Sequence, residues 1–297
     1  MDIKITMLGT SGSSPTKSRS LPGVALTYNG NNILFDCGEG TQMQMIKYGI
    51  NFSKIIAIFI SHAHGDHVIG LAGLVRTMAM NRRSADLDIF VPRGYEKVIK
   101  TLILFDKALM TYRINVYGIR SGIVYKARDF TVSAFPVNHT ISSCGYVFRE
   151  NDRRRFIVEK AKRLGIEGTM HSVLQKRGWI KIKGKRITLE SVTLVQKGKK
   201  MVYATDTRPS RSTVSAARNA DLLIHESSYS ESESDLAKDR KHSTSAEAAG
   251  IAKAARAKRL VLTHISARHS SVERLEKEAK AVFKNSSVAE DGDIIIL

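Results

Sequence analysis

Cysteine, proline and long apolar runs are all scarce in this chain of 297 residues. Its two cysteines, Cys37 and Cys144, are too few for a disulfide framework, and neither belongs to a CxxC spacing that would indicate zinc or redox chemistry. We interpret both as small buried residues. No apolar stretch reaches the roughly 18 to 20 residues that a membrane-spanning helix needs, and the N-terminus lacks the features of a signal peptide. The sequence therefore predicts a cytoplasmic protein.

Acidic residues are also few, since 28 Asp and Glu stand against 47 Lys and Arg and leave a net charge of +19 at pH 7. A surplus of this size favours a polyanionic partner. The alternative is a general basic bias that serves solubility. The distribution favours the first interpretation, because residues 149–200 hold sixteen Lys or Arg and only five Asp or Glu. The positive charge is therefore concentrated in about a sixth of the chain.

The order of apolar patterns predicts one large α/β domain that spans residues 1–297. Short β-rich runs fill the first third, and apolar residues at three- and four-residue spacing then indicate a helix at 68–80. Further strands and helices follow, with helices expected at 95–105, 211–220, 245–258 and 271–283. A β-rich opening with later helices, seen twice, indicates two sheets packed face to face with helices on their outer faces.

Residues 149–200 interrupt this order. The segment is dense in Lys and Arg, contains the only tryptophan, Trp179, and has no strand that a central sheet would bury. We predict an inserted arm with one small helix at 157–165. Its basic residues lie on or beside that helix, in an arrangement suited to following a phosphate backbone: Arg153, Arg154, Arg155, Lys160, Lys162 and Arg163. A solvated run of charge is the alternative.

The run SHAHGDH, residues 61–67, places three histidines and an aspartate at the end of a predicted strand. Imidazole nitrogen and carboxylate oxygen are ligands that zinc prefers. In an extended loop, His62 and His64 point to one side, while Asp66 and His67 can turn to another. Gly65 gives the loop freedom for that turn. The run can therefore serve two adjacent ions, although alone it offers too few ligands.

Three later strands also end in a polar residue, namely His139, Asp206 and His264. The ends of strands are where open α/β architectures gather the groups of their active sites. These three positions supply the ligands that the first run lacks. The joint pattern therefore predicts a metal centre assembled from residues far apart in the sequence.

At this point the sequence resembles the metallo-β-lactamase superfamily and, within it, the tRNA 3'-end endonucleases called ribonuclease Z. HxHxDH identifies only the superfamily. The narrower resemblance depends on further motifs, which are PTKSRS at 15–20, ILFDCGEGTQMQ at 33–44, DTRPS at 206–210, HESSY at 225–229, HST at 242–244 and THISAR at 263–268. It covers nearly the whole chain and implies a four-layer αββα sandwich with an inserted flexible basic arm at 149–200.

The resemblance also implies which side chains hold metal. One zinc ion is expected on His62, His64 and His139, and a second on Asp66, His67 and His264. Asp206 is expected to bridge the two ions. Such a pair shares an activated water and stabilises both oxygens of an in-line displacement at phosphorus.

Two residues are expected to handle protons. The family assigns the proton-accepting role to the aspartate that matches Asp66, which we expect to orient the nucleophile and share its proton. His242 matches the HST loop and is placed to protonate the leaving 3'-oxygen or to bind the scissile phosphate. Glu226 could hold His242 in the required tautomer, or it could be a structural carboxylate at a strand end.

The resemblance further implies that the arm grips the body of precursor tRNA. Lys17 and Arg19, in the PTKSRS loop, are expected to contact the acceptor end; an ordinary polar turn is the alternative. Family members commonly pair as homodimers, so a homodimer is expected here. The sequence departs from the family in two places, because the arm tip contains no proline and Ser20 stands where Asn is usual.

The predicted function is removal of the 3' trailer from precursor tRNA by a zinc-dependent endoribonuclease, with a cut near the discriminator base that leaves a 3'-hydroxyl. A small-molecule ester or phosphodiester hydrolase of the same superfamily is the main alternative, and the basic arm argues against it. A non-catalytic RNA-binding module with structural zinc fits less well, because structural zinc sites are closed and usually rich in cysteine.

Overall fold

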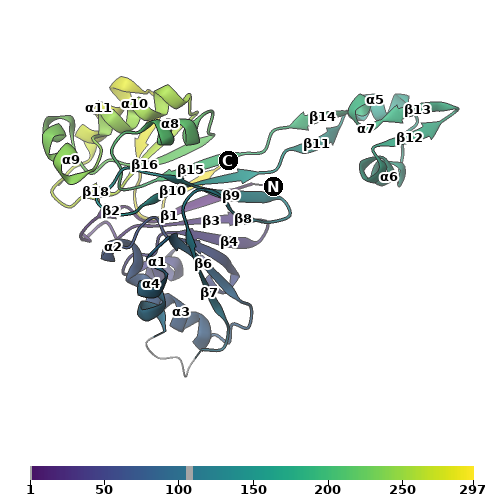
Figure 1. The fold of residues 1–297 in the computed structure, drawn as a ribbon. Coiled ribbons are helices and arrows are strands. Elements are labelled where there is room, and N and C mark those ends of the chain that lie inside the picture. Colours follow the sequence, from purple (N-terminus) through teal and green to yellow (C-terminus); the bar gives the residue numbers. More distant parts are fainter. Residues whose placement is uncertain (1, 105–109) are drawn as a thin grey trace. The chain divides into compact units, whose positions relative to one another are not determined.

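The computed structural model describes residues 2–104 and 110–297, and it divides the chain into two compact units. The first unit contains residues 1–148 and 200–297, and the second, which we call the arm unit, contains residues 149–199. Figure 1 labels most of the elements of both units. None of the helices in the described part is long and apolar enough to span a bilayer.

Two seven-stranded sheets form the centre of the first unit. In spatial order the first sheet contains β20 (Ile294–Ile296), β1 (Lys4–Gly9), β3 (Gly23–Tyr28), β4 (Asn31–Phe35), β5 (Ile55–Phe59), β6 (Leu87–Pro92) and β7 (Ile114–Ile119). The second contains β19 (Ser286–Val288), β17 (Leu260–Thr263), β16 (Leu222–Glu226), β15 (Lys200–Ala204), β10 (Cys144–Glu150), β9 (Phe130–Pro136) and β8 (Gly122–Lys126). In the second sheet, β15, β16, β17 and β19 run parallel.

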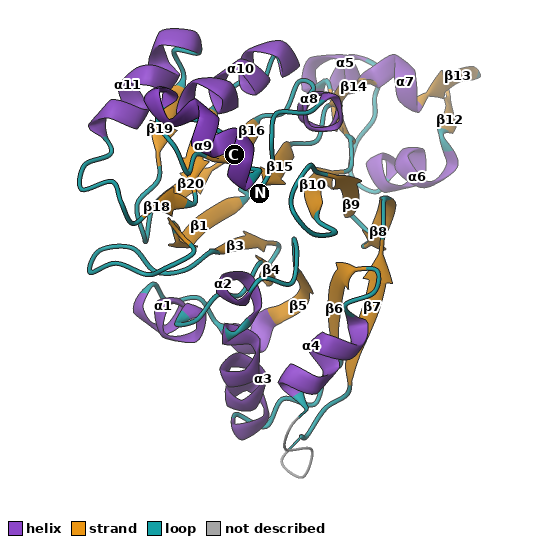
Figure 2. Cartoon of the chain, turned by 60° about the vertical axis from the view of Figure 1, so that its left-hand side comes forward, coloured by secondary structure: helices purple, strands orange, loops and turns teal. Residues whose placement is uncertain are grey.

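Helices cover the outer face of each sheet, as Figure 2 shows. The first sheet carries α1 (Thr41–Lys47), α2 (Gly65–Val68), α3 (Gly70–Met80) and α4 (Glu96–Ile103). The second carries α8 (Arg211–Ala217), α9 (Ser234–Arg240), α10 (Ser245–Ala255) and α11 (Glu273–Val282). The predicted αββα layering is therefore confirmed. The helix expected at 95–105 is α4, although Phe105 lies outside the described residues.

Three apolar cores separate these four layers, and the two-residue period of the strands assigns side chains to them. On β4, Ile33 and Phe35 enter the core between the sheets, while Leu34 enters the core under α3 and α4. On β15, Tyr203 enters the core between the sheets, while Val202 packs under α8 and α10. Successive residues of a strand point to opposite faces, so a sheet covered on both faces reads as a continuous apolar run.

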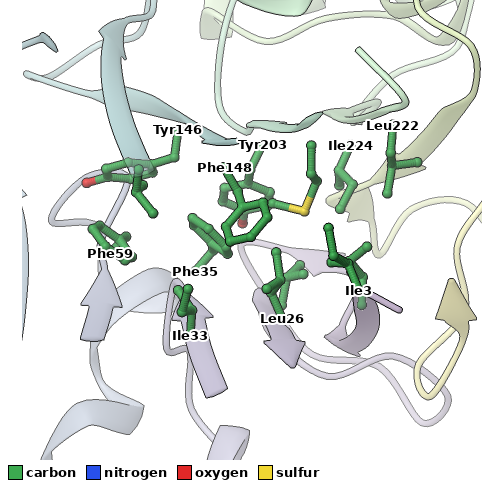
Figure 3. Packing of buried hydrophobic residues seen from close by; sticks show 14 of the residues in the cluster. Ile3, Leu26, Ile33, Phe35, Phe59, Tyr146, Phe148, Tyr203, Leu222 and Ile224 are labelled. Atoms are coloured by element: carbon green, nitrogen blue, oxygen red, sulfur yellow. The ribbon is translucent and has the colours of Figure 1, made fainter. Parts of the chain in front are cut away.

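The core between the sheets is rich in aromatic rings (Figure 3). Phe35 stacks on Phe59 with ring centroids 5.5 Å apart, and Tyr146 and Tyr203 of the opposite sheet lie 5.9 and 5.8 Å from Phe35. Burial of each ring removes a large apolar area from water and fixes the spacing of the sheets. Cys37 and Cys144 are both buried and unpaired, as expected.

The arm unit contains more structure than the single helix that the sequence predicted. It has two antiparallel strand pairs, β11 (Arg153–Phe156) with β14 (Thr193–Gln196) and the hairpin of β12 (Trp179–Ile182) with β13 (Lys185–Thr188). Three helices accompany them, α5 (Val158–Arg163), α6 (Met170–Arg177) and α7 (Leu189–Val192). Its small core contains Ala161, Ile166, Leu174, Ile187 and Val192. The strands were missed because charged residues hide their weak alternation.

Candidate metal centre and active site

The seven predicted ligands all lie at the carboxyl ends of strands in the first unit. His62 and His64 follow β5, and the short helix α2 then presents Asp66 and His67. His139 follows β9, Asp206 follows β15, and His264 follows β17. Because β15 and β17 flank β16 in parallel, their carboxyl ends meet at one edge of the sheet.

Four of these residues form one group. A ligand atom from each of His62, His64, His139 and Asp206 lies within 4.8 Å of those of the other three. His64 points Nδ1 inward, 3.0 Å from Nε2 of His62 and 3.4 Å from Nε2 of His139. Oδ2 of Asp206 lies 3.6 Å from Nε2 of His62 and 3.7 Å from Nε2 of His139. The arrangement matches the ligand set expected for the first ion.

The other three residues form a second group beside it. Nε2 of His67 lies 3.4 Å from Oδ2 of Asp66, and Nε2 of His264 lies 3.6 Å from the same oxygen. Asp206 also reaches this group, because its Oδ1 lies 3.4 Å from Nε2 of His67 and 3.1 Å from Nε2 of His264. The carboxylate of Asp206 therefore faces one group with each oxygen, as a bridging ligand would.

The spacing and the unpaired atoms fit divalent metal. Tetrahedral ligands at bond lengths of about 2.0–2.1 Å lie roughly 3.3 Å apart, close to the separations seen in both groups. Nε2 of His67 and Nε2 of His264 are buried and have no hydrogen-bond partner among the described residues. A buried polar atom without a partner costs free energy, and a metal ion would supply that partner. The residues of the site are therefore suited to bind divalent cations.

A carboxylate behind the ligands, Asp36, orients His67. Its Oδ2 accepts from Nδ1 of His67 at 2.8 Å and from the hydroxyl of Tyr203 at 2.8 Å. The amide and hydroxyl of Ser61 also donate to Asp36, at 2.7 and 2.8 Å. With Nδ1 committed to a carboxylate, His67 must present Nε2 to the metal position.

Three other histidines are oriented in a similar way. The hydroxyl of Ser61 donates to Asp36 and lies 2.9 Å from Nδ1 of His62, so it accepts the proton of that nitrogen. The hydroxyl of Ser228 likewise donates to Glu226 and lies 2.9 Å from Nδ1 of His264. Nδ1 of His139 lies 3.2 Å from the carbonyl oxygen of Lys241.

No role was predicted from the sequence for Asp36 or Ser228. Both lie in the motifs that carry the resemblance, FDCGEG and HESSY, and Asp36 directly follows a buried strand. That position was the available signal. Their contacts with histidines distant in the sequence could not be read from the chain alone.

The histidines of the cluster lower the pKa values of its two carboxyl groups. Burial raises the pKa of the Asp206 carboxyl, but His264, His67 and His62 outweigh it and hold that pKa well below its ordinary value. Burial likewise raises the pKa of Asp66, and hydrogen bonds with His264 and His67 bring it well below the ordinary range. Both carboxylates are therefore ionised at neutral pH, as metal ligands must be.

The backbone is strained at three positions of the centre. Asp36, Asp206 and His264 have φ values of 55°, 46° and 57°, in the left-handed region that residues other than glycine seldom adopt. Gly12 is needed nearby, since a Cβ there would lie 2.5 Å from the ring of His264. Backbone strain of this kind persists only where the surroundings hold it in place.

His242 lies at the rim of the metal groups, paired with Glu226. Its Nδ1 lies 3.0 and 3.1 Å from the two carboxylate oxygens of Glu226, which is buried. Burial lowers the pKa of His242, but Glu226 raises it more, to about 9. The contact expected between these two residues is present. A ligand atom of His242 also lies within 4.8 Å of those of Asp206 and His264.

A cleft of about 380 Å³ opens over the centre. His64, Asp66, His139, Asp206 and His242 reach its wall, together with Ser13, Tyr229, Arg240 and Arg268. The amide of Ser13 donates to Oδ2 of Asp66 at 2.9 Å. Two arginines beside the cluster make the cleft suitable for a phosphate ester.

The two basic residues predicted in the PTKSRS loop differ in their surroundings. Lys17 is exposed to solvent. Arg19 turns inward, and its guanidinium donates to the hydroxyl of Thr10 at 2.7 Å and to the carbonyl of Ala289 at 2.6 Å. The side chain of Arg19 therefore fixes the loop in place, and Lys17 is the one left accessible.

The predicted RNA contacts in the arm unit also fall into two groups. Arg153 forms an ion pair with Glu150 at 3.0 Å, and Arg154 forms one with Glu190 at 3.4 Å. In contrast, Arg155, Lys162 and Arg163 have no ion pair with any described residue. The second group can therefore meet phosphates without giving up a carboxylate partner.

Comparison with known proteins places the chain among nucleases. Ribonuclease Z of Archaeoglobus fulgidus is 44% identical over 297 residues, which cover 98% of this chain and 96% of that protein. The chain belongs to the ribonuclease Z family. The crystal structure of human tRNase Z, short form, is 28% identical, covers 99% of this chain and 98% of its own, and superposes with a TM-score of 0.72.

Two further matches concern the fold and the family. The metallo-β-lactamase fold protein YhfI from Bacillus subtilis superposes with a TM-score of 0.71 at 21% identity, over 100% of this chain and 99% of that one. A family model described as Anti-Pycsar protein Apyc1 matches residues 3–287, so the chain also belongs to the family that this model describes. With the ribonuclease Z relatives, they confirm the predicted family, fold and enzyme class, a hydrolytic endoribonuclease of the metallo-β-lactamase superfamily.

Proposed function

We propose that this ribonuclease Z removes the 3' trailer from precursor tRNA, with a single cut near the discriminator base that leaves a 3'-hydroxyl. The observation that carries the proposal is the two-sided contact of Asp206, whose oxygens face two separate groups of ligands. A pair of metal ions at such a site suits in-line displacement at phosphorus. The family membership supports RNA as the substrate.

Zinc is the metal that fits the donors best, with two ions per chain. The ligand atoms are imidazole nitrogens and carboxylate oxygens only, the set that zinc accepts in open catalytic sites. We assign His62, His64 and His139 to one ion and Asp66, His67 and His264 to the other, with Asp206 shared. When bound, such ions polarise the phosphoryl oxygen and provide a nucleophile at neutral pH.

Asp66 has the role of orienting the attacking group and sharing its proton. Its Oδ2 already lies near Nε2 of His67 and Nε2 of His264, and it accepts from the amide of Ser13. These contacts hold the carboxylate in one orientation at the wall of the cleft. A carboxylate fixed in this way adds direction to the attack, although metal ligation weakens it as a base.

His242 has the role of proton donor to the leaving 3'-oxygen. The buried carboxylate of Glu226 occupies its Nδ1, so Nε2 is the nitrogen that remains for the substrate. His242 lines the same cleft as Asp66. The two residues therefore supply the opposite ends of one displacement, with proton acceptance on one side and proton donation on the other.

The arm unit is proposed as the exosite that grips the body of the tRNA. Arg155, Lys162 and Arg163 are the strongest candidates there, because they have no ion pair with a described residue. Arg153 and Arg154 can contribute only by sharing their carboxylate partners. Lys17 is proposed to contact the acceptor end, with Arg19 holding its loop.

A homodimer in the cytoplasm is the proposed working form. Exposed apolar side chains on α1 and at the start of α3 support an interface, since Met43, Ile46 and Ile69 are 73%, 62% and 49% exposed. The helices α1 and α3 are neighbours in the fold. Apolar residues gathered on a surface mark sites where proteins associate.

The test is cleavage of a tRNA transcript that carries a 3' extension, with and without added zinc. The intact protein should release the trailer in one cut, and Asp66→Ala should abolish the reaction. Bis(p-nitrophenyl) phosphate serves as the comparison substrate. Hydrolysis of that small ester without any cut in the transcript would instead support the alternative, a small-molecule phosphodiesterase.

A further inference from the structure

The arm unit contains a cavity whose lining, apart from Lys162, none of the roles above uses. Its volume is about 500 Å³, and it lies between the end of β11, the helix α5 and the start of α6. Phe156, Val158 and Ile166 supply apolar walls, and Lys162, Glu167 and His171 supply polar ones. All of these residues belong to the arm unit itself.

Two flat rings form one side of this cavity. Phe156 and His171 meet edge to face, with centroids 4.5 Å apart and planes at 88°. An edge-to-face pair leaves ring faces available for a third planar group. Val158, on α5, is 59% exposed although it is apolar. A planar, apolar ligand would therefore make more favourable contacts in this cavity than it makes in water.

The charge around the cavity selects an anionic ligand. Lys162 lines it, and Lys160 and Arg163 lie on the same helix, α5. None of the three has an ion pair with a described residue. Glu167 is the one carboxylate in the lining, and it can accept a hydrogen bond from an amino group. The ligand that these groups suit is flat and apolar in one part and negatively charged in another.

A nucleotide has both parts, and a second arm unit fits less well because of its charge. Residues 149–199 hold fifteen Lys or Arg and five Asp or Glu, so two arm units brought together would repel each other. RNA is bound through unpaired bases that stack on aromatic or histidine rings, while its phosphates pair with Lys and Arg. Charge complementarity thus favours RNA over another arm unit.

We propose that this cavity binds one unpaired nucleobase of the RNA substrate. The base stacks against His171 and Phe156, and the neighbouring phosphate pairs with Lys162. This inference rests on the proposed function, because it takes the substrate to be a folded RNA with unpaired bases. The stacking contact would supplement the charge attraction of the arm unit, and only an unpaired base can make it.

The test compares two substitutions of the same kind in the same unit. Val158→Phe fills the cavity, while Val195→Phe places the same ring on β14, at a residue that is 48% exposed and does not line the cavity. Affinity is measured for a tRNA transcript with a 3' extension and for a blunt RNA duplex of equal length. His171→Ala serves as a second variant that removes a wall instead of filling the space.

Val158→Phe and His171→Ala should each weaken binding of the transcript about tenfold, the scale of one lost stacking contact, and leave the duplex unaffected. Val195→Phe should bind both RNAs like the unchanged protein. The dependence of affinity on salt should change by at most one phosphate contact in Val158→Phe, because only the phosphate next to the displaced base pairs with Lys162. Equal binding by Val158→Phe and Val195→Phe, or equal loss on the transcript and the duplex, would overturn the proposal.

Cleavage of the transcript is measured in parallel so that the two proposals can fail separately. If the unchanged protein does not cut the transcript while Val158→Phe still weakens binding selectively, the proposed function is wrong and the base site stands. If the protein cuts the transcript and Val158→Phe binds normally, the base site is wrong and the function stands.

Discussion

At the scale of single residues, the metal centre depends on which nitrogen each histidine turns inward. His67 is directed by Asp36, His62 by Ser61 and His264 by Ser228. Each partner is itself held by a further hydrogen bond, as Asp36 is by Tyr203. The ligands are therefore oriented before any ion binds, which lowers the cost of binding.

Removal of the hydroxyl that holds Asp36 should weaken metal binding. Tyr203→Phe deletes one donor to that carboxylate, so we expect about tenfold lower zinc affinity, the lower end of the effect of outer contacts on metal sites. Tyr146→Phe is the matched control, because its hydroxyl is equally buried but donates to the carbonyl of Ile60. Zinc titration in competition with a coloured chelator measures both. Equal affinities in the two variants would contradict the role of Asp36.

Loss of the proposed proton donor should affect turnover and spare the metal. His242→Ala is expected to lower kcat by about 10²- to 10⁴-fold, the usual contribution of general acid catalysis. Glu226→Gln should cause a smaller loss, because the imidazole remains but loses its charged partner. Metal content per chain is measured beside single-turnover rates. A drop in bound zinc for His242→Ala would show that His242 is a ligand instead.

The metal ligands that could be predicted from the sequence are those of a residue type that seldom occurs at the end of a strand. His62, His64 and His67 could be recognised because their spacing leaves few other uses. Asp36 could not, since an aspartate after a strand is common and its contact with His67 exists only in the folded chain. The contact of Arg19 with RNA stays a prediction, whereas its hydrogen bond to Ala289, 270 residues away, could not be predicted from the sequence.

At the scale of elements, the loop of residues 10–20 connects the metal centre to the turn of residues 290–293, which we call the C-terminal anchor. Near one end, Ser13 donates to Asp66, and Gly12 packs against His264. At its ends, the amide of Ser20 and the hydroxyl of Thr10 both donate to Asp291, at 2.6 and 2.8 Å. The loop is thus held from both sides, with Lys17 exposed between the two anchors.

Loss of the C-terminal anchor should loosen this loop. Asp291→Ala removes the acceptor for Ser20, Thr10 and Gln44, so we expect unfolding free energy to fall by about 3 kcal/mol. KM for the extended transcript should rise, while hydrolysis of bis(p-nitrophenyl) phosphate should change little. Asp293→Ala, in the same turn, serves as the control because its carboxylate accepts from the amide of Glu290 and, among the described residues, from no group of the loop. Equal effects of the two variants would argue against the anchor.

Elements with strong periodicity were predictable, and short ones were not. The helix at 70–80 follows from the spacing of Leu71, Leu74 and Val75, all of which are buried. The helix α1 was missed because the exposed Met43 and Ile46 break the apolar stripe. In the arm unit, β11 reads RRRF, a sequence whose charged residues hide any alternation, and it pairs with β14. Tertiary pairing decided those cases.

At the scale of the whole molecule, the excess positive charge of +19 predicts strong dependence of RNA binding on salt. Arg163→Ala should lower the slope of log Kd against log salt concentration by about one, because it removes one phosphate contact. Lys238→Ala removes the same unit of charge from a lysine already paired with Asp235 at 3.2 Å, and it should leave the slope unchanged. Slopes come from binding titrations of the transcript at several salt concentrations. An unchanged slope in Arg163→Ala would remove that residue from the RNA interface.

The fold and the metal centre depend on one another across the molecule. Two sheets bring His62 to His67 from the first and His139, Asp206 and His264 from the second to a common edge. The aromatic core between them sets the distance, since Tyr203 both packs against Phe35 and donates to Asp36. Stability and metal binding therefore share residues.

The most direct measurement is anomalous diffraction from crystals of the intact protein grown with zinc. We predict two zinc peaks per chain, one among His62, His64 and His139 and the other among Asp66, His67 and His264, with a carboxylate oxygen of Asp206 next to each. A single peak, or two peaks that Asp206 does not join, would contradict the central claim that this aspartate bridges a pair of ions.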